Sequence, residues 1–229
     1  MRAMINYFKK NRYIFLPLSI VFLLQFLTYY GTKAITASFH AHDLTTAFDR
    51  AVPLIPWFIY IYLGSYAFWI INYLLASKAG RKHFYAVTAC ALLCYLVCAV
   101  IFIVFPTTYE RPELIAHTFS EKLINYVFSV DTPVNLFPSM HCLLSWVCYI
   151  CVRGKKQISA AYRVFSLIFA ILVCVSTQVV KQHYVVDIFG GILIAELMWL
   201  IVKKARLYRV TYSIFERRRL EKRKHAPRQ

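Results

Sequence analysis

The stretch FYAVTACALLCYLVCAVIFIVFPTT, residues 84–108, contains no charged side chain and no polar face at helical spacing. A helix on the surface of a soluble protein shows polar side chains along one side. Crossing a bilayer takes about 17–25 residues, so this stretch is long enough to do so. We therefore predict a transmembrane helix here, and this segment decides the fold class of the whole chain.

Similar stretches lie on both sides of it. Four more are free of Asp, Glu, Lys and Arg and approach the length of a membrane crossing, and a sixth, shorter one contains Glu196. The expected spans are residues 13–30, 53–77, 84–109, 132–152, 164–180 and 188–202. The sequence thus predicts an all-α fold, a bundle of six transmembrane helices. Glu196 is expected to face the interior of that bundle, paired or protonated.

The composition excludes several other classes of protein. Hydrophobic residues make up 60% of the 229 residues and only 16% are charged, whereas soluble domains are nearer half apolar. The aromatic content of 17% excludes disordered and low-complexity chains. A net charge of +17 would indicate nucleic-acid binding in a soluble protein. The positions of the charges argue against a nucleic-acid partner here.

Lys and Arg residues are concentrated in every second connection between the expected spans. They cluster before the first span, at residues 78–82, at residues 153–163 and after residue 202. The alternate connections hold only Lys33, Arg50, Arg111, Lys122 and Lys181. Because positively charged connections stay in the cytoplasm, both termini of this multi-pass protein of the cell membrane are expected to be cytoplasmic.

This orientation divides the chain into three regions. Residues 1–83 hold the first two spans and an outer loop, and residues 84–202 form a catalytic core of four helices. Residues 203–229 form a basic cytoplasmic tail. The segments 31–52, 110–131 and 181–187 then face the extracytoplasmic side, where the substrate would be met. The large positive charge is expected to attract the anionic headgroups of membrane lipids.

Residues able to do chemistry gather at the outer ends of the spans. Arg111 follows the third span, and Ser139, Met140 and His141 open the fourth. The fifth span leads into Lys181 and His183, and Asp187 follows as the sixth begins. Polar groups that converge at one membrane level from separate connections are candidates for a functional site.

Each of these spacings suits phosphoryl transfer without a metal or another cofactor. Asp187 lies four residues after His183, so on a helix its carboxylate can hold one imidazole nitrogen and leave the other free to attack. His141 can protonate a leaving oxygen. The N–H groups of a helix that starts at Ser139 form an anion site, and Arg111 and Lys181 supply cations.

Two other classes of function stay open. His141, His183 and Asp187 are also good metal ligands, although no further ligand pattern accompanies them. A non-enzymatic lipid-binding protein or a small transporter is the remaining alternative, although no paired halves or broken helices are evident.

The motifs resemble those of the type-2 phosphatidic acid phosphatase superfamily, which contains six-span membrane enzymes. Pro-Ser-x-His stands at residues 138–141, and Ser-x(6)-His-x(3)-Asp stands at residues 176–187, within a similar region of residues 84–202. The resemblance implies a phosphorylated lipid or polyprenyl substrate and a phosphohistidine intermediate. It further implies His183 as nucleophile, Asp187 as its partner, His141 as general acid, and Arg111 with Ser139 and Met140 as phosphate binders.

The chain departs from the family pattern at three positions. Val104 and Thr177 stand where the family has Lys and Arg, and Met140 replaces a Gly. Such departures are similar to the branch of inositol phosphorylceramide and sphingomyelin synthases, which implies headgroup transfer between lipids as an alternative to phosphatase activity. We expect Lys181 to substitute in part for a missing cation.

Overall fold

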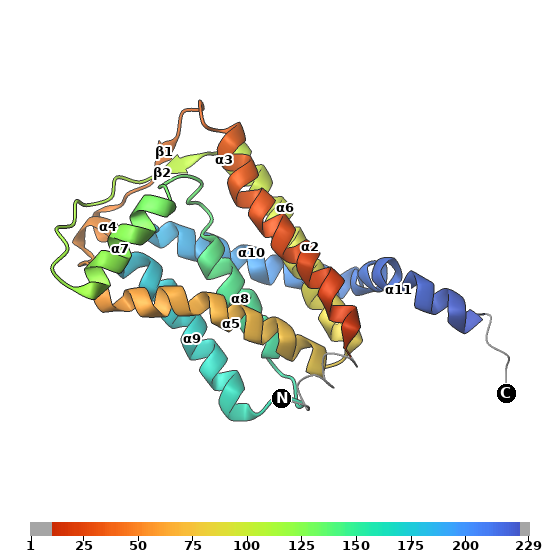
Figure 1. The fold of residues 1–229 in the computed structure, drawn as a ribbon. Coiled ribbons are helices and arrows are strands. Elements are labelled where there is room, and N and C mark those ends of the chain that lie inside the picture. The colour runs from red at the N-terminus through yellow and green to blue at the C-terminus, as the bar shows by residue number, and fades with distance from the viewer. Residues whose placement is uncertain (1–10, 225–229) are drawn as a thin grey trace.

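The computed structural model describes residues 11–224, with side chains described as far as Glu216 (Figure 1). The expected all-α class is confirmed, since helices account for most of the described chain. The expected cytoplasmic positions of Arg2, Lys9, Lys10 and residues 225–229 lie outside the described residues.

Within the described residues, five helices are long and apolar enough to cross a membrane. The first, Arg12–Ile35, is continuous but composite, with an α-helical middle, α2 (Phe15–Phe26), a π-helical turn at Leu27–Gly31 and a last turn, α3 (Thr32–Ile35). The others are α5 (Ile59–Lys78), which extends back to Pro56, α6 (Arg81–Val104), α9 (Ala160–Val179) and α10 (Val185–Lys204).

The fourth expected span differs from the prediction. Of residues 132–152 only α8 (Met140–Val152) is helical, and residues 132–139 are irregular. This helix packs against α5, α6, α9 and α10 at the centre of the bundle, and most of its residues are buried. A helix enclosed by other helices in this way does not have to match the thickness of the lipid.

The irregular residues 132–139 are stabilised by bonds to other parts of the protein. The N–H groups of Leu136 and Phe137 both donate to Oγ1 of Thr107 at 2.9 Å. The N–H of Ser139 donates to the carbonyl of Asp187 at 3.2 Å. Non-helical backbone is tolerated at membrane depth where protein groups satisfy it in this way.

The outer surface of the bundle is apolar. Large exposed side chains include Phe22 and Phe26 of α2, Ile70 and Ile71 of α5, Leu96 and Val100 of α6, Phe165 and Ile168 of α9, and Phe189 and Leu193 of α10. An apolar surface this extensive belongs against lipid, since soluble monomers expose only small contiguous apolar patches. The fold is therefore that of a membrane protein.

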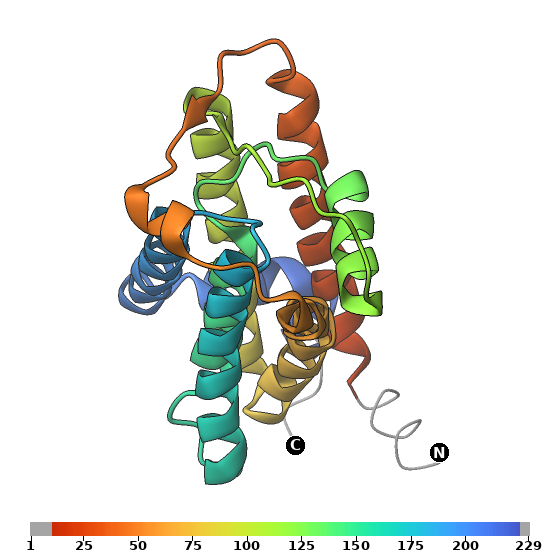
Figure 2. The ribbon, with the colours of Figure 1, turned by 90° about the vertical axis from the view of Figure 1, so that its left-hand side faces the viewer.

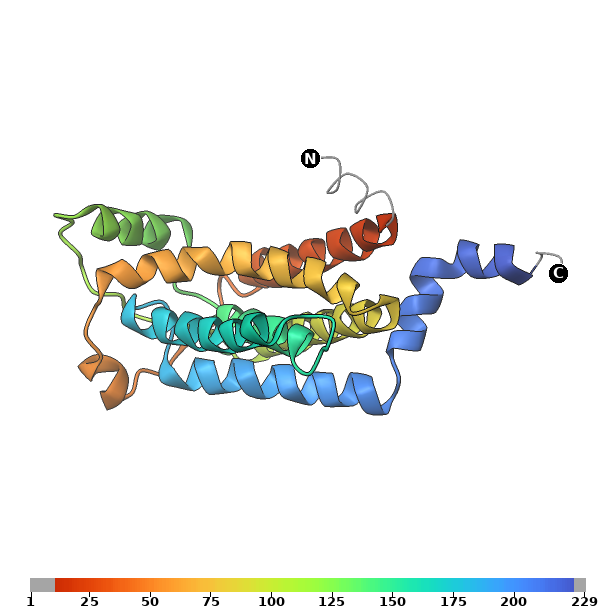
Figure 3. The ribbon, with the colours of Figure 1, turned by 90° about the horizontal axis from the view of Figure 1, so that it is seen from below.

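The longer connections, residues 36–55, 105–139 and 180–184, lie at one end of the bundle (Figure 2). A short parallel pair joins β1 (His42–Asp43) to β2 (Thr107–Thr108), and two short helices lie at the same end, α4 (Ala47–Ala51) and α7 (Phe119–Val130). The tail helix α11 (Tyr208–Lys224) lies at the opposite end (Figure 3).

Two ion pairs stabilise the end that holds α11. Arg81 pairs with Glu216, which also accepts a hydrogen bond from the hydroxyl of Tyr85 at 3.0 Å, so the start of the tail is part of the fold. Arg153 binds both carboxylate oxygens of Glu196, at 2.6 and 2.9 Å. The expected pairing of Glu196 is therefore confirmed, but the carboxylate stays partly exposed instead of facing a closed interior.

Candidate active site

His183 is presented by a tight turn between α9 and α10. Lys181 adopts the left-handed backbone conformation, with φ of 57°. The N–H groups of Gln182 and His183 then both donate to the carbonyl of Thr177, and the side-chain amide of Gln178 donates to the carbonyl of His183 at 2.8 Å. The turn is thus bonded to the last turns of α9, and this fixes the position of the imidazole.

His183 and Asp187 form a hydrogen-bonded pair. Nδ1 of His183 lies 3.0 Å from Oδ2 of Asp187, an oxygen that also accepts from the N–H of Tyr184 at 3.1 Å. Asp187 is fully buried in the first turn of α10. Burial alone would lower the pKa of His183, but the hydrogen bond and the charge of Asp187 outweigh it, so the pKa is raised above the ordinary value of 6.5. This leaves Nε2 as the nitrogen available to a substrate.

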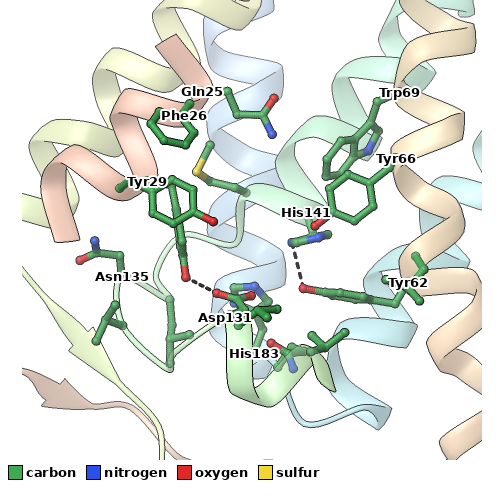
Figure 4. A pocket seen from close by; sticks show the side chains of 18 of the residues that line it. Gln25, Phe26, Tyr29, Tyr62, Tyr66, Trp69, Asp131, Asn135, His141 and His183 are labelled. Atoms are coloured by element: carbon green, nitrogen blue, oxygen red, sulfur yellow. Dashed lines mark hydrogen bonds between the residues drawn. The ribbon is translucent and has the colours of Figure 1, made fainter. Parts of the chain in front are cut away.

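His141 lies beside this pair in the first turn of α8. Its ring stacks on the ring of Tyr62, with centroids 4.3 Å apart, and its centroid lies 6.2 Å from that of His183. Nδ1 lies 3.5 Å from the Tyr62 hydroxyl (Figure 4). Nε2 is buried and has no hydrogen-bond partner among the described residues. Aromatic packing therefore fixes the ring and leaves one nitrogen for a substrate.

The start of α8 packs directly against α10. Ser139 is the amino-terminal cap of α8, and its hydroxyl accepts from the N–H of Cys142 at 3.3 Å. A Cβ placed on Gly191 would lie 2.8 Å from the carbonyl oxygen of Ser139, and one on Gly190 would meet the ring of Phe137 at 2.6 Å. The two glycines therefore allow the close approach that holds His141 near His183.

His141, His183 and Met140 line a cavity of about 540 Å³. Its walls combine aliphatic and aromatic side chains, and Figure 4 shows several of the aromatic ones around the two histidines. The aromatic residues of the walls include Phe22, Phe26, Tyr29, Tyr62, Tyr66 and Trp69. A concave apolar site with a few polar groups at one end is the usual form of a small-molecule site.

The cavity is open towards the outside of the bundle between the first span and α5. Phe22 and Phe26 on one side, and Tyr66 and Ile70 on the other, line the cavity and are also exposed on the outer surface. In a membrane that surface meets lipid. A lipid tail could therefore lie along these side chains with its polar end at His183.

Arg111 lies beside this cavity but does not line it. Its guanidinium donates to the carbonyls of Asp131 and Phe128, and Nη2 donates to Oε1 of Gln182 at 2.7 Å. Nε is buried without a partner among the described residues, and burial lowers the pKa of the guanidinium. The structure thus brings Arg111 close to the site through Gln182.

Lys181 is directed away from the cavity. Its ammonium donates to the carbonyls of Asp49, at 2.9 Å, and of Val52, at the end of α4. The residue is buried, and this burial lowers the pKa of its amine. Asp49 is itself bonded to the other end of the same turn, because its Oδ1 accepts from the N–H of Val185 at 2.7 Å. Lys181 and Asp49 together bind the turn that carries His183 to the segment that holds α4.

Asp131 and Gln182 are two polar residues of the cavity wall next to the histidines that the sequence analysis did not select. Asp131 accepts a hydrogen bond from the hydroxyl of Tyr29, and Gln182 precedes His183 in the chain. Nothing in the sequence around Asp131 sets it apart from the other acidic residues of the chain. The only signal for Gln182 was its position next to the expected nucleophile.

Among the described residues, no three His, Cys, Asp or Glu side chains lie where they could hold a metal ion together. The geometry that a binuclear metal hydrolase requires is therefore not provided by this part of the chain. The pairing of His183 with Asp187 is better suited to orienting an imidazole that attacks directly.

Comparison with known proteins identifies a family that matches this chain. The family model of the PAP2 superfamily matches residues 88–211, more than half of the chain. Comparison with curated protein sequences gives no match. The matched region contains Arg111, His141, His183 and Asp187, and its motifs are those that suggested the type-2 phosphatidic acid phosphatases. The chain belongs to the PAP2 superfamily.

Proposed function

We propose that the chain is an integral-membrane lipid phosphate phosphatase that acts without a metal through a phosphohistidine. The observation that carries this proposal is the placement of the His183–Asp187 pair and His141 at one end of a single cavity. Members of the superfamily are phosphatases or phosphotransferases. The apolar outer surface of the bundle supports a substrate that arrives from the lipid.

The first half of the reaction forms the phosphohistidine. Nε2 of His183 attacks phosphorus while Asp187 stabilises the positive charge that develops on the ring. The bond between phosphorus and the leaving oxygen breaks, and His141 donates its proton to that oxygen. The products are the lipid alcohol and a phosphoryl group on Nε2.

The second half returns the enzyme to its first state. His141, now neutral, takes a proton from a water molecule, whose oxygen attacks phosphorus. The P–N bond breaks, the electron pair returns to Nε2 of His183, and phosphate leaves. His141 is protonated again and ready for the next substrate.

The proposal includes the arrangement in the membrane. All six helices of the bundle, α8 included, would lie across the membrane, with both termini in the cytoplasm. The site then faces the extracytoplasmic side, as the distribution of Lys and Arg residues predicts. Substrates that fit are phosphorylated lipids or polyprenyl phosphates whose phosphoryl group sits at the interface.

Phosphate release from a lipid phosphate by purified protein in detergent tests the proposal. We expect turnover by the wild type with and without chelator, and at least about a thousandfold less by His183→Ala. A His183→Ala protein as active as the wild type would rule out this mechanism. A wild type that binds lipid phosphate without turnover would favour a binding protein or transporter.

A second candidate function is headgroup transfer from a phospholipid to a lipid hydroxyl. It is favoured by the electrostatics of the cavity, because Val104 and Thr177 supply no charge, Lys181 is directed elsewhere, and Asp131 adds a negative charge. Such a site repels a phosphomonoester dianion more than a phosphodiester, which has one negative charge. A lipid hydroxyl would then replace water in the second step.

Product analysis distinguishes the two functions. The protein is supplied with a phosphodiester lipid, with and without a second lipid that has a free hydroxyl. A new phospholipid made from the second lipid supports the transferase, and free phosphate from a phosphomonoester supports the phosphatase.

A further inference from the structure

The groups that would bind the phosphoryl oxygens are not the expected cations. Lys181 donates to backbone carbonyls of the first outer loop, and Arg111 does not line the cavity. A phosphoryl group in transfer nevertheless requires donors aimed at its non-bridging oxygens. Another donor must lie at the cavity wall beside His183.

The side chain of Gln182 has the required position. It lines the cavity, directly precedes His183 in the chain and is only 2% exposed. Its Oε1 accepts from Nη2 of Arg111 at 2.7 Å. Its Nε2 is buried and has no hydrogen-bond partner among the described residues.

The hydrogen bond to Arg111 determines which end of the Gln182 amide, the oxygen or the NH₂ group, points away from the guanidinium. A guanidinium has donors and no acceptor, so only the oxygen of the amide can face it. A flipped amide would place two donors against each other and is excluded. Arg111 is in turn bonded to the carbonyls of Asp131 and Phe128. The NH₂ group of Gln182 is therefore held in a fixed direction and lacks only an acceptor.

We propose that Nε2 of Gln182 donates a hydrogen bond to a non-bridging oxygen of the phosphoryl group that His183 attacks. This inference rests on the proposed function and deepens it by naming a donor at the site. Arg111 acts through Gln182 as a positioning residue and polarises its amide. The amide is neutral, so it directs a hydrogen bond at the oxygen without adding a full positive charge. The cations that the family has at positions 104 and 177 are therefore not replaced in charge.

A binding measurement tests the assignment independently of turnover. Orthovanadate, which mimics a phosphoryl group in transfer, is titrated into purified protein in detergent, and inorganic phosphate serves as a second probe. Gln182→Leu removes the donor, and we expect it to bind vanadate about 10- to 100-fold more weakly, the usual loss for a hydrogen bond to a charged oxygen. Gln157→Leu, the same change at an exposed residue at the opposite end of the bundle, is the matched control and should bind as the wild type does.

Gln182→Glu separates the proposed role from a structural one. The carboxylate still accepts from Arg111, so the melting temperature should not fall, but it has no donor and adds a negative charge. We expect the vanadate affinity of this variant to drop by more than about 100-fold. If Gln182 served only to hold Arg111, the variant would bind vanadate as the wild type does.

The outcomes distinguish this inference from the proposed function. If Gln182→Glu or Gln182→Leu binds vanadate as the wild type does while His183→Ala is inactive, only the role of Gln182 is overturned. If the wild type binds neither vanadate nor phosphate, both proposals are overturned. Weaker binding by both Gln182 variants, with unchanged melting of Gln182→Glu, supports the assignment.

Discussion

Nδ1 of His183 and Oδ2 of Asp187 lie 3.0 Å apart, although one residue belongs to a loop and the other to the first turn of α10. The same oxygen of Asp187 accepts a hydrogen bond from the N–H of Tyr184. The carboxylate therefore has two roles, since it caps α10 and also orients the imidazole. The orientation of the His183 imidazole, the proposed nucleophile, is thus coupled to the start of a helix. A mutation of Asp187 must be designed to separate these two roles.

Asp187→Asn provides that separation. The amide oxygen can still accept from Tyr184, so the melting temperature should change little. That oxygen then also stays beside Nδ1, because both groups contact Oδ2, but the neutral amide no longer stabilises the positive charge that develops on the imidazole during attack. We expect kcat to fall by about 10²–10⁴-fold. Phosphate-release kinetics and thermal unfolding check this, and an unchanged kcat would contradict the role of Asp187.

The pH dependence of kcat/KM should show the raised pKa of His183. The attacking imidazole must be neutral, so activity is low below its pKa and rises with pH until the proton is lost. Because Asp187 raises the pKa above 6.5, the acid limb should bend above pH 6.5. In the Asp187→Asn protein the bend should move to lower pH. A bend that stays in place in this variant would mean that another group controls the limb.

His141→Ala should reveal a general acid by its dependence on the leaving group. With an alkyl phosphate, whose leaving oxygen needs a proton, we expect a loss of about 10²–10⁴-fold in kcat. With a nitrophenyl phosphate the leaving group needs little help, and the loss should be much smaller. Parallel assays on both substrates check this. Equal losses would indicate that His141 binds the phosphoryl group instead.

Lys181→Ala should destabilise the turn at residues 180–184, which carries His183. The change leaves the carbonyls of Asp49 and Val52 without their buried donor, at a cost of about 1–3 kcal/mol in the free energy of unfolding. Turnover should fall with the displaced turn, and Lys181→Arg should recover part of both. Thermal unfolding and kcat/KM are measured together. A Lys181→Ala protein of normal stability that has lost affinity for vanadate would place Lys181 in the phosphate site.

The expected orientation is checked by labelling with a thiol reagent that does not cross membranes. In a background without the native cysteines, Glu113→Cys should react from outside the cell, and Gln157→Cys should react only after the membrane is opened. Both residues are exposed at opposite ends of the bundle, so accessibility alone does not separate them. The reverse pattern would place the histidines on the cytoplasmic side.

The long spans and the spacing of His183 and Asp187 could be predicted from the sequence because both follow from local periodicity. The length of α8 could not, since an apolar stretch has the same composition whether lipid or protein surrounds it. The start of α7 could also have been predicted locally. The hydroxyl of Thr118 and the carboxylate of Glu121 form a capping box there, and this pair is visible in the sequence.

The directions of Lys181 and Arg111 depended on tertiary contacts. Nothing near Lys181 in the sequence indicates that the carbonyls of Asp49 and Val52, far earlier in the chain, would bind its ammonium. Gln182 belongs to no motif. The direction of its NH₂ group follows only from the hydrogen bond that Arg111 donates to its Oε1. Charge and spacing identified the site, whereas the assignment of its donors needed the fold.

The aromatic wall of the cavity has a consequence for the evolution of specificity. Phe22, Tyr29, Tyr62 and Trp69 all precede residue 88, where the match to the family model begins. The matched region thus contains His141 and His183, whereas these four aromatic residues lie upstream of it, and other residues of the wall, such as Tyr126 and Val130, lie within the match. Under the proposed function, relatives with the same histidine motifs but different upstream residues would offer a lipid chain a different wall, and a comparison restricted to the matched region would miss that part of specificity.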